Sequence, residues 1–225
     1  MNYITPKYEL FDFKFLSGGR KMAKKEKGLT REKYLIPDQI KVLGQKTEER
    51  SKLDLMAGRT TWPRIWMMVH LGIASGLRVA EMANLKISDI TFGHKPCLYV
   101  VGKGNKERTV ELDKDLVKHI RGHVKDYDLG EDDYLLTSSH GKKYNTRGLQ
   151  SHFKMACANA GLPGYLSIHS TRHSFGVLLY QKTLNLRAVQ KQMGHEKPST
   201  TAIYADVLPE EINDDMNDTF NGIFA

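Results

Sequence analysis

The chain has 225 residues, 40% of them apolar, and a formal net charge of +8. This composition predicts one large globular domain, with or without an arm, and excludes a membrane-spanning protein, because no apolar run reaches the roughly 18 residues that a spanning helix needs. The N-terminus has no signal-peptide pattern, and the only cysteines, Cys97 and Cys157, lack metal-type spacing. We therefore expect a soluble, cytoplasmic protein with reduced thiols and no membrane partner.

Positive charge is concentrated in the first 204 residues. Residues 205–225 contain six acids and no Lys or Arg, so the residues before them carry a formal charge of +14. A basic body with an acidic tail favours a polyanionic partner, and double-stranded DNA is the first candidate. Charge alone leaves a solubilising surface as an equal alternative.

Residues 1–33 are expected to form a basic arm rather than a domain. Gly18-Gly19 ends an aromatic stretch, and a run rich in Lys and Arg follows. Such a run can bind along a phosphate backbone by releasing counterions, or it can be a solvated linker. The DNA-binding candidates in the arm are Arg20, Lys21, Lys24, Lys25 and Lys27.

Helices are predicted next along the chain. Pro37, followed by an acid, predicts the start of a short helix. The apolar stretch 62–74 predicts a buried helix that ends at Gly76, and apolar spacing over 79–85 predicts another helix with Arg78 at its start.

Residues 87–112 predict a small antiparallel sheet. A strand at 98–101 leads into a glycine-rich turn, after which an apolar stretch returns. Lys103 is expected near the tip of this hairpin, and Lys106 and Arg108 are further DNA-binding candidates.

The rest of the chain is predicted to be mainly helical. Apolar periodicity predicts helices at 113–124, 145–160, 170–179 and 186–193, the last of them closed by Gly194. The fold class is therefore α+β, mainly α-helical with a small antiparallel β-sheet. We place a catalytic domain at 34–208 and a C-terminal helix at 209–225, whose apolar face docks either on its own body or on a neighbouring subunit.

Several polar side chains match the needs of phosphodiester chemistry. The transition state gains negative charge on the non-bridging oxygens, so fixed cationic donors are the main requirement. Arginine meets it best, because its planar fork binds phosphate bidentately. Arg78 and Arg172 are the candidates, although Arg78 can instead pair with Glu81, three residues further along.

A tyrosine nucleophile needs help to lose its proton, because the phenol pKa is near 10. Tyr204 follows His195 by nine residues, and a nearby imidazole can accept that proton. Lys103 can protonate the departing 5′ oxygen, with Lys106 as the alternative. His169 lies three residues before Arg172, so on a helix the two share a face and can approach one phosphate.

Nine histidines raise the alternative of a metal site. The chain has no H-E-x-x-H motif and no phosphate-binding G-x-x-x-x-G-K-[ST] loop, so we expect neither a metal nor another cofactor. His173 is expected to be structural, hydrogen-bonded behind the site.

In combination, these motifs resemble the tyrosine recombinase (phage integrase) family from about Gly28 to the C-terminus. The motifs that carry the resemblance are Gly76-Leu77-Arg78 with Glu81, Gly102-Lys103-Gly104, His169-x-x-Arg172-His173, Gly194-His195 and Tyr204. Each motif is weak alone, and the ordered set is specific.

The resemblance implies a role for each cation. Arg78 and Arg172 would hold the scissile phosphate, Glu81 would support the first arginine, and Lys103 would be the general acid for the 5′-OH. Family members work as tetramers on two DNA sites.

The resemblance also implies the remaining roles. His169 would assist proton transfer with Tyr204, and His195 would hydrogen-bond a non-bridging oxygen. Tyr204 would form a 3′-phosphotyrosyl link, and religation would need no ATP.

Family members usually carry a helical DNA-clamping domain before the catalytic domain, and this chain shows no such region. We expect either a minimal recombinase or a part of a longer protein, with the basic arm or an accessory protein supplying part of the clamp. Three other functions stay open: a type IB topoisomerase, a non-catalytic accessory DNA-binding protein, and a metal-free ribonuclease that uses His169 and His195.

Overall fold

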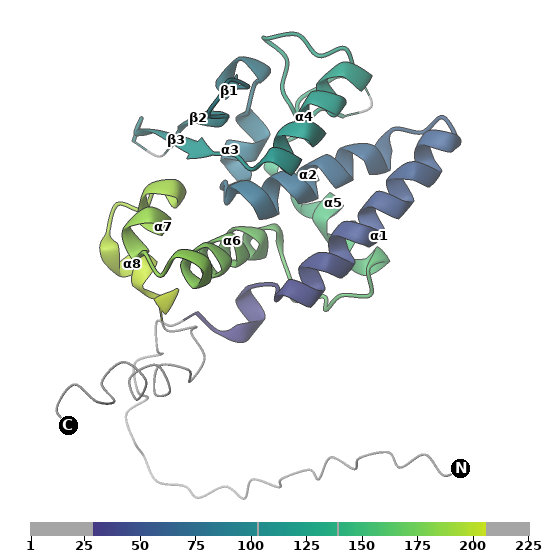
Figure 1. The fold of residues 1–225 in the computed structure, drawn as a ribbon. Coiled ribbons are helices and arrows are strands. Elements are labelled where there is room, and N and C mark those ends of the chain that lie inside the picture. Colours follow the sequence, from purple (N-terminus) through teal and green to yellow (C-terminus); the bar gives the residue numbers. More distant parts are fainter. Residues whose placement is uncertain (1–28, 103, 139, 206–225) are drawn as a thin grey trace, which may run out of the picture.

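The computed structural model describes residues 29–102, 104–138 and 140–205. Helices make up most of the molecule, and a small sheet lies at one end of it (Figure 1). In chain order the elements are η1 (Arg31–Lys33), α1 (Pro37–Met56), α2 (Thr61–Ser75), α3 (Val79–Asn84), η2 (Ile87–Asp89), β1 (Ile90–Thr91), β2 (Cys97–Val101), β3 (Glu107–Glu111), α4 (Lys114–Asp126), α5 (Thr146–Asn159), α6 (Ile168–Thr183), α7 (Leu186–Met193) and α8 (Pro198–Ala202). The predicted fold class, mainly helical α+β, is confirmed.

Helix α1 is longer than the sequence indicated, with 20 residues in place of a short helix. Its buried positions are Leu43, Thr47, Ser51 and Asp54, and three of these four are polar. The Thr47 hydroxyl donates to the Leu43 carbonyl at 2.7 Å, and the Asp54 carboxylate accepts from the backbone N–H of Trp62 at 3.2 Å. Apolar periodicity therefore does not reveal the second half of this helix.

Helix α2 is the centre of the fold. It contacts α1, α3, α4, α5 and α6, and ten of its fifteen residues are buried. Gly76 ends the helix with φ = +61°, as the sequence predicted. A Cβ at this position would lie 2.4 Å from Cδ1 of Phe175, so the turn needs glycine both for its backbone conformation and for its packing. The turn places Arg78 at the start of α3.

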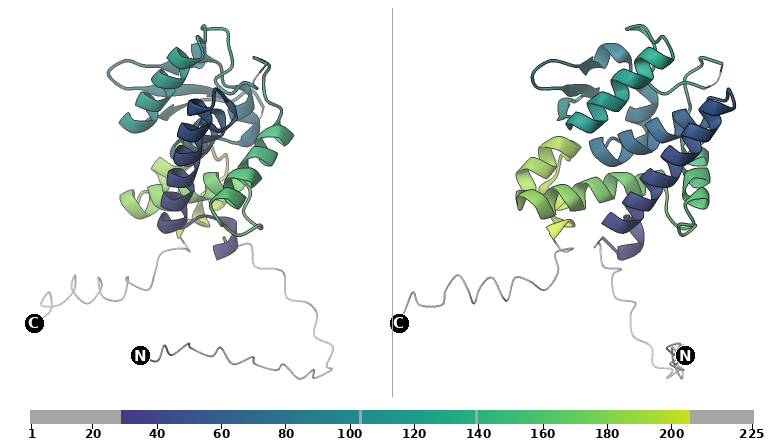
Figure 2. Two further views of the ribbon diagram at one scale, coloured as in Figure 1. Left: turned by 90° about the vertical axis from the view of Figure 1, so that its right-hand side faces the viewer. Right: turned by 45° about the vertical axis from the view of Figure 1, so that its right-hand side comes forward.

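The described residues include a three-stranded antiparallel sheet in the order β1-β2-β3. Strands β2 and β3 form a hairpin in which Leu98 pairs with Val110 and Val100 with Arg108. Leu98, Val100 and Val110 point into the core, as the alternation of buried and exposed residues requires. Figure 2 shows that the sheet and α7 lie at the same side of the molecule, and β3 contacts α7.

A second apolar cluster joins α6, α7 and the end of the described chain. Its buried members are Val177, Val189, Met193 and Tyr204. Leu29, from the end of the predicted arm, packs against this cluster, and η1 contacts α6. This end of the predicted arm therefore lies on the body of the domain.

Residues 1–28 and 206–225 lie outside the described residues, and with them most of the predicted arm and the whole predicted C-terminal helix. Within the described part of the chain, no helix has both the length and the apolar character that crossing a bilayer requires.

Candidate active site

A basic pocket of about 680 Å³ lies between the β2–β3 hairpin and the loop that joins α7 to α8. Its lining includes Arg78, Lys106, Lys197 and His195. Lys106 forms an ion pair with Glu196 at 3.0 Å, and both side chains are more than half exposed. Since cationic groups outnumber acids in this hollow, it suits a polyanionic backbone.

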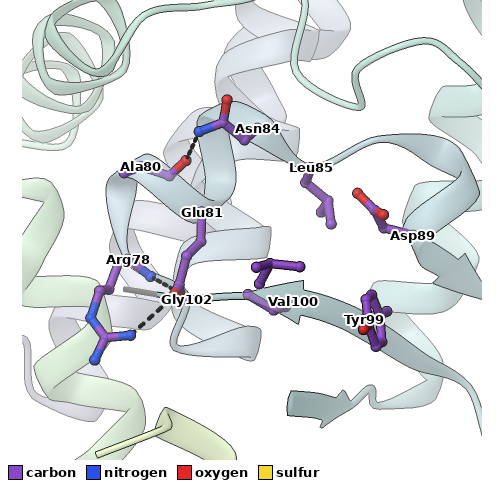
Figure 3. Close-up of a pocket in the computed structure, with 10 residues that line it drawn as sticks. Arg78, Ala80, Glu81, Asn84, Leu85, Asp89, Tyr99, Val100 and Gly102 are labelled. Atoms are coloured by element: carbon purple, nitrogen blue, oxygen red, sulfur yellow. Dashed lines mark hydrogen bonds and ion pairs between the residues drawn. The ribbon is translucent and has the colours of Figure 1, made fainter. Parts of the chain in front are cut away.

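A second pocket, of about 370 Å³, lies between α3 and β2. Figure 3 shows Arg78 and Glu81 turned toward each other at one end of it, with Asp89 and Tyr99 at the other. Arg78 and Gly102 line both pockets, so the two hollows adjoin at Arg78.

Arg78 is held by three hydrogen bonds. Its Nη1 donates to Oε1 of Glu81 at 2.8 Å, and its backbone N–H donates to Oε2 of the same carboxylate at 2.8 Å. Nη2 donates to the Gly194 carbonyl at 3.2 Å, and the side chain remains 38% exposed. The ion pair that the spacing allows is present, and the guanidinium still faces the pocket.

Glu81 lies at the centre of this network and is nearly buried. Arg108 donates to both of its oxygens, from Nη1 at 2.9 Å and from Nη2 at 2.8 Å. Burial favours the neutral acid, but hydrogen bonds from Arg108 and Arg78 outweigh it and lower the pKa of Glu81 to about 2. The carboxylate therefore stays ionised at neutral pH.

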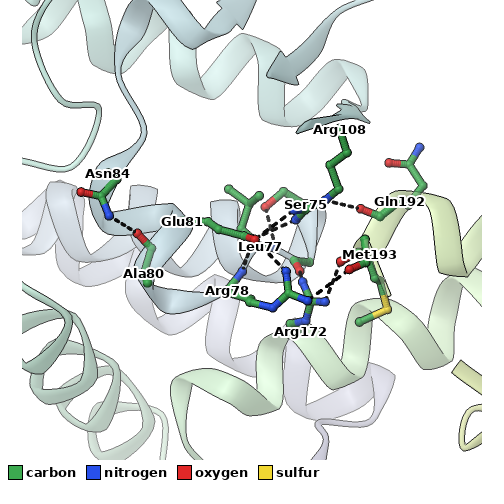
Figure 4. Close-up of polar contacts among 12 residues, drawn as sticks. Ser75, Leu77, Arg78, Ala80, Glu81, Asn84, Arg108, Arg172, Gln192 and Met193 are labelled. Carbon is green, nitrogen blue, oxygen red and sulfur yellow. Dashed lines mark hydrogen bonds and ion pairs between the residues drawn. The ribbon is translucent and has the colours of Figure 1, made fainter. Parts of the chain in front are cut away.

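Arg108, a DNA-binding candidate from the sequence, lines the basic pocket but is largely buried, and its DNA-binding role stays a prediction. Its side chain is 10% exposed, and its Nε donates to the Gln192 carbonyl at 3.1 Å. Because the guanidinium is already engaged with Glu81 and Gln192, it holds neighbouring elements together in this structure (Figure 4).

Arg172 projects from α6 into the same network. It is 8% exposed, and it donates to the Gly76 carbonyl at 2.6 Å and to the Met193 carbonyl at 2.7 Å. Burial and the charge of Arg78 lower the pKa of Arg172 to about 10, so it stays protonated at neutral pH. Figure 4 shows the Arg78 and Arg172 side chains beside each other. Two cations brought together in this way favour an anion between them.

Tyr204 is 1% exposed and belongs to the apolar cluster under α6. Burial raises the pKa of its phenol to about 12, although the charges of Arg172 and Arg78 act in the opposite direction. Its hydroxyl lies 3.3 Å from Nδ1 of His173. A Cβ at Gly176 would lie 2.6 Å from Cζ of the ring, so this glycine makes room for the tyrosine.

The contacts of Tyr204 in this structure are with His173 and His195, so the proton-transfer role predicted for His169 stays a prediction. His169 is exposed on the first turn of α6, whereas Arg172 is buried. His169 lines another pocket, with Arg147 and Lys154, and the imidazole that contacts the phenol is that of His173.

His195 follows Gly194, whose φ of +63° ends α7 as predicted. Its Nδ1 lies 3.0 Å from Oγ1 of Thr201, and its ring stacks on that of Tyr204 with centroids 6.1 Å apart. Burial and the charges of Arg172 and Arg78 lower the pKa of His195 to about 4. The imidazole is therefore neutral at pH 7, and Nε2 is the nitrogen that can bind a ligand in the pocket.

Lys103 lies outside the described residues, as do Arg20, Lys21, Lys24, Lys25 and Lys27, so their roles stay predictions. Gly102 and Gly104, on either side of Lys103, line the basic pocket. Sequence reasoning missed Thr201, whose only signal is its position three residues before Tyr204. Within the described residues there is no cluster of three or more His, Cys, Asp or Glu side chains suited to a metal ion.

The sequence and the fold are both similar to those of known proteins. Residues 33–211 match the phage integrase family. A tyrosine recombinase of Pseudothermotoga lettingae is 32% identical over 155 residues, which cover 68% of this chain and 53% of that protein. The chain spans about half the length of the curated relatives that it matches.

Solved structures share the fold. A crystal structure of the XerH site-specific recombinase bound to its palindromic difH substrate in a post-cleavage complex aligns with a TM-score of 0.68 at 22% identity, covering 82% of this chain and 52% of that one. A lambda integrase tetramer bound to a Holliday junction aligns with a TM-score of 0.61 at 19% identity, covering 82% and 50%. Together with the match over residues 33–211, the residues gathered at the pocket show that the chain belongs to the phage integrase family.

Proposed function

We propose that this protein is a site-specific DNA recombinase that cleaves and rejoins strands through a covalent link between Tyr204 and a 3′ phosphate. One observation carries the proposal. The guanidinium of Arg78 lines a basic pocket, that of Arg172 is buried beside it, and the charges of both act on the phenol of Tyr204. A pair of cations beside a candidate nucleophile is what attack on a phosphodiester requires.

The two arginines supply electrostatic stabilisation. A scissile phosphate in the pocket would accept hydrogen bonds from Arg78 and Arg172, and these bonds strengthen as charge grows on the non-bridging oxygens. Both side chains are oriented in advance by carbonyl acceptors, so little reorganisation accompanies the reaction. His195, neutral at pH 7, adds a further donor from Nε2 when Nδ1 accepts a hydrogen bond from Thr201.

The nucleophile passes its proton to an imidazole. Burial and the charge of Arg172 lower the pKa of His173 to about 4, so this ring is neutral at pH 7. As the Tyr204 oxygen bonds to phosphorus, its proton moves to a neutral imidazole, and the bond to the 5′ oxygen breaks. The candidate acceptors are His173, which lies 3.3 Å from the phenol in its resting position, and His169. The departing oxygen takes a proton from Lys103 in this proposal.

The buried position of the Tyr204 phenol corresponds to a resting state in this proposal. Tyr204 is 1% exposed, so its side chain has to leave the apolar cluster before the phenolic oxygen reaches a phosphate in the pocket. Tyr204 follows the short helix α8, and in this proposal the Thr201–His195 contact of that helix is kept when the tyrosine moves. DNA binding is the event that we propose releases the tyrosine.

DNA and further copies of the chain are the proposed partners. The XerH structure contains its DNA substrate, and the lambda integrase structure is a tetramer on a Holliday junction. We infer double-stranded DNA as the substrate and a tetramer on DNA as the active assembly. The protein would act on DNA in the cytoplasm, with an accessory protein or the basic arm supplying part of the grip on DNA.

A covalent-capture experiment tests the proposal. The protein is incubated with a pool of nicked duplexes of randomised sequence, in which the short 5′-hydroxyl fragment is lost after cleavage. Denaturing gels then separate protein–DNA adducts, whose DNA is sequenced. We expect an adduct with the wild-type protein and none with Tyr204→Phe.

Two results would contradict the proposal. The first is an adduct that persists in Tyr204→Phe, which would point to another nucleophile. The second is retention of DNA by the wild-type protein without any adduct in the whole pool, which would favour a non-catalytic DNA-binding role.

A further inference from the structure

Arg108 connects three parts of the site. It stands on β3, opposite Val100 of β2, and its side chain runs below the surface. From there the guanidinium reaches Glu81 on α3 and the Gln192 carbonyl on α7 (Figure 4). Arg108 therefore links the sheet to α3, which begins directly after Arg78, and to α7, which ends shortly before His195.

The hydrogen bonds form a chain from Arg108 to Arg78. Oε1 of Glu81 accepts from both guanidinium groups, and Oε2 accepts from Arg108 and from the Arg78 backbone N–H. A carboxylate with four donors has one orientation, and Arg108 provides two of them. The direction of the Arg78 side chain therefore depends on Arg108 through Glu81.

Close packing at Gly194 completes the arrangement. A Cβ at this glycine would lie 2.7 Å from Cδ and 3.0 Å from Nε of Arg108. The absence of a side chain lets Arg108 lie against the turn that leads into His195, and the Gly194 carbonyl accepts from Arg78 at 3.2 Å. The turn is thus held between the two arginines.

We infer that Arg108 is a positioning residue for strand cleavage, which holds Arg78 through Glu81 and the His195 turn through Gln192 and Gly194. The inference rests on the proposed function. Arg108 also lines the basic pocket, but its guanidinium is largely buried, so in this role it acts through Glu81, in contrast to the more exposed Arg78. The alternative is an ion pair that stabilises the domain without affecting the geometry of the site.

Three variants and a matched control separate the two roles. Arg108→Met removes the charge and keeps an unbranched side chain, and Arg108→Lys keeps the charge without the planar fork. Arg121→Met is the control, since Arg121 also donates from a guanidinium to a carbonyl, that of Phe92, but lies on α4 away from the pocket. Glu81→Gln is combined with Arg108→Met in a double-mutant cycle.

The first measurement is the single-turnover rate of adduct formation at saturating protein, on a duplex recovered from the randomised pool. We expect Arg108→Met and Arg108→Lys to lower this rate by about 100-fold, the usual effect of misplacing a binding group by about 1 Å. The dissociation constant for DNA is expected to change by less than about threefold, and Arg121→Met should match the wild type. The double variant should be no slower than the slower single variant.

The pH profile is a measurement that a purely structural ion pair would not alter. Glu81 faces Arg78, Arg108 and, more distantly, Arg172. Without Arg108, the hydrogen bonds and the charge that it supplies no longer lower the pKa of Glu81, so this pKa rises from about 2 and cleavage by Arg108→Met should fall as pH is lowered through the new value. Adding Glu81→Gln should remove this extra acid limb, because the group that titrates is gone.

Binding of inorganic phosphate, followed by ³¹P NMR line broadening, tests the inference without cleavage. We expect binding weaker by about tenfold in Arg108→Met and unchanged in Arg121→Met, since the loss of one oriented charge-assisted contact has about this size. Wild-type cleavage rates in Arg108→Met and Arg108→Lys, or unchanged phosphate affinity in both, would overturn the inference. Absence of an adduct from the wild type would refute the proposed function instead, while the phosphate measurement still decides the role of Arg108. Should Arg108→Met fail to fold by circular dichroism, Arg108→Lys carries the same measurements.

Discussion

Replacement of Gly176 by alanine should force Tyr204 out of its buried position. An added Cβ would lie 2.6 Å from Cζ of Tyr204 and 2.9 Å from Sδ of Met193, well inside van der Waals contact. Overpacking of this kind costs about 1–3 kcal/mol. Moving the ring also breaks its hydrogen bond to His173, worth about 1 kcal/mol, whereas alanine in a helix gains about 1 kcal/mol over glycine. The expected net loss of stability is about 1–3 kcal/mol.

Gly44→Ala is the matched control for this prediction. Gly44 lies within α1, and a Cβ there would meet nothing within 4 Å, so only the gain in helix propensity of about 1 kcal/mol applies. Urea unfolding of both variants measures the difference. A Gly176→Ala protein as stable as Gly44→Ala would refute the claim that the tyrosine fills the space beside this glycine.

The same substitution should change the titration of the phenol. Burial raises the pKa of Tyr204 to about 12, so the folded state holds the phenolic proton more tightly than the unfolded chain does. The stability that this group contributes is fully present below pH 10, the ordinary phenol value, and is lost as pH rises toward 12. In Gly176→Ala the pKa should fall toward 10, which difference absorbance at 295 nm against Tyr204→Phe would detect.

Three further predictions concern the residues around the phosphate site. Arg78→Ala and Arg172→Ala should each abolish covalent adduct formation while DNA affinity, measured by fluorescence anisotropy, changes little, because other cations remain; a large loss of affinity would contradict this. Thr201→Val should lower the single-turnover cleavage rate by about 10- to 100-fold, because the His195 ring loses the contact at Nδ1. Thr201→Ser should retain most of the rate, and equal rates for the two variants would show that the hydroxyl is not needed. The pKa of Glu81 is lowered to about 2, so the stability that its ion pair contributes is present above about pH 4.5 and is lost as pH falls through 2. The difference in Tm between the wild type and Glu81→Gln should therefore shrink over this pH range. A Tm difference that does not change with pH would contradict the ion pair.

Helix ends and the hairpin could be predicted from the sequence because their signals are local. Gly76 and Gly194 mark the ends of α2 and α7, and the alternation from Leu98 to Val101 marks β2. The length of α1 could not be predicted, because its inner face includes buried polar side chains such as Thr47 and Ser51, which leave no apolar period in the sequence.

The contacts within the site were harder to predict from the sequence than the region in which the residues lie. Spacing brings residues into the same region, but which imidazole meets Tyr204 depends on how α6 rotates against α7 and α8. That rotation leaves His173 half-buried beside Tyr204 and His169 exposed, although the two residues belong to one short motif. Arg108 shows the same limit, since its partner Glu81 lies 27 residues earlier in the chain and only the packing of β3 against α3 brings the two together.

The hydrogen bonds that hold the two arginines explain why glycine stands at positions 76 and 194. Gly76 and Gly194 each end a helix in the left-handed conformation, so the last carbonyls of α2 and α7 turn toward the same point. Arg172 donates to the carbonyls of Gly76 and Met193, and Arg78 donates to that of Gly194. The C-terminal end of a helix carries partial negative charge, so these carbonyls attract the guanidinium groups and fix their direction. A phosphate that binds there meets cations already oriented by two helix ends, which is why the glycines and the arginines occur together in the chain.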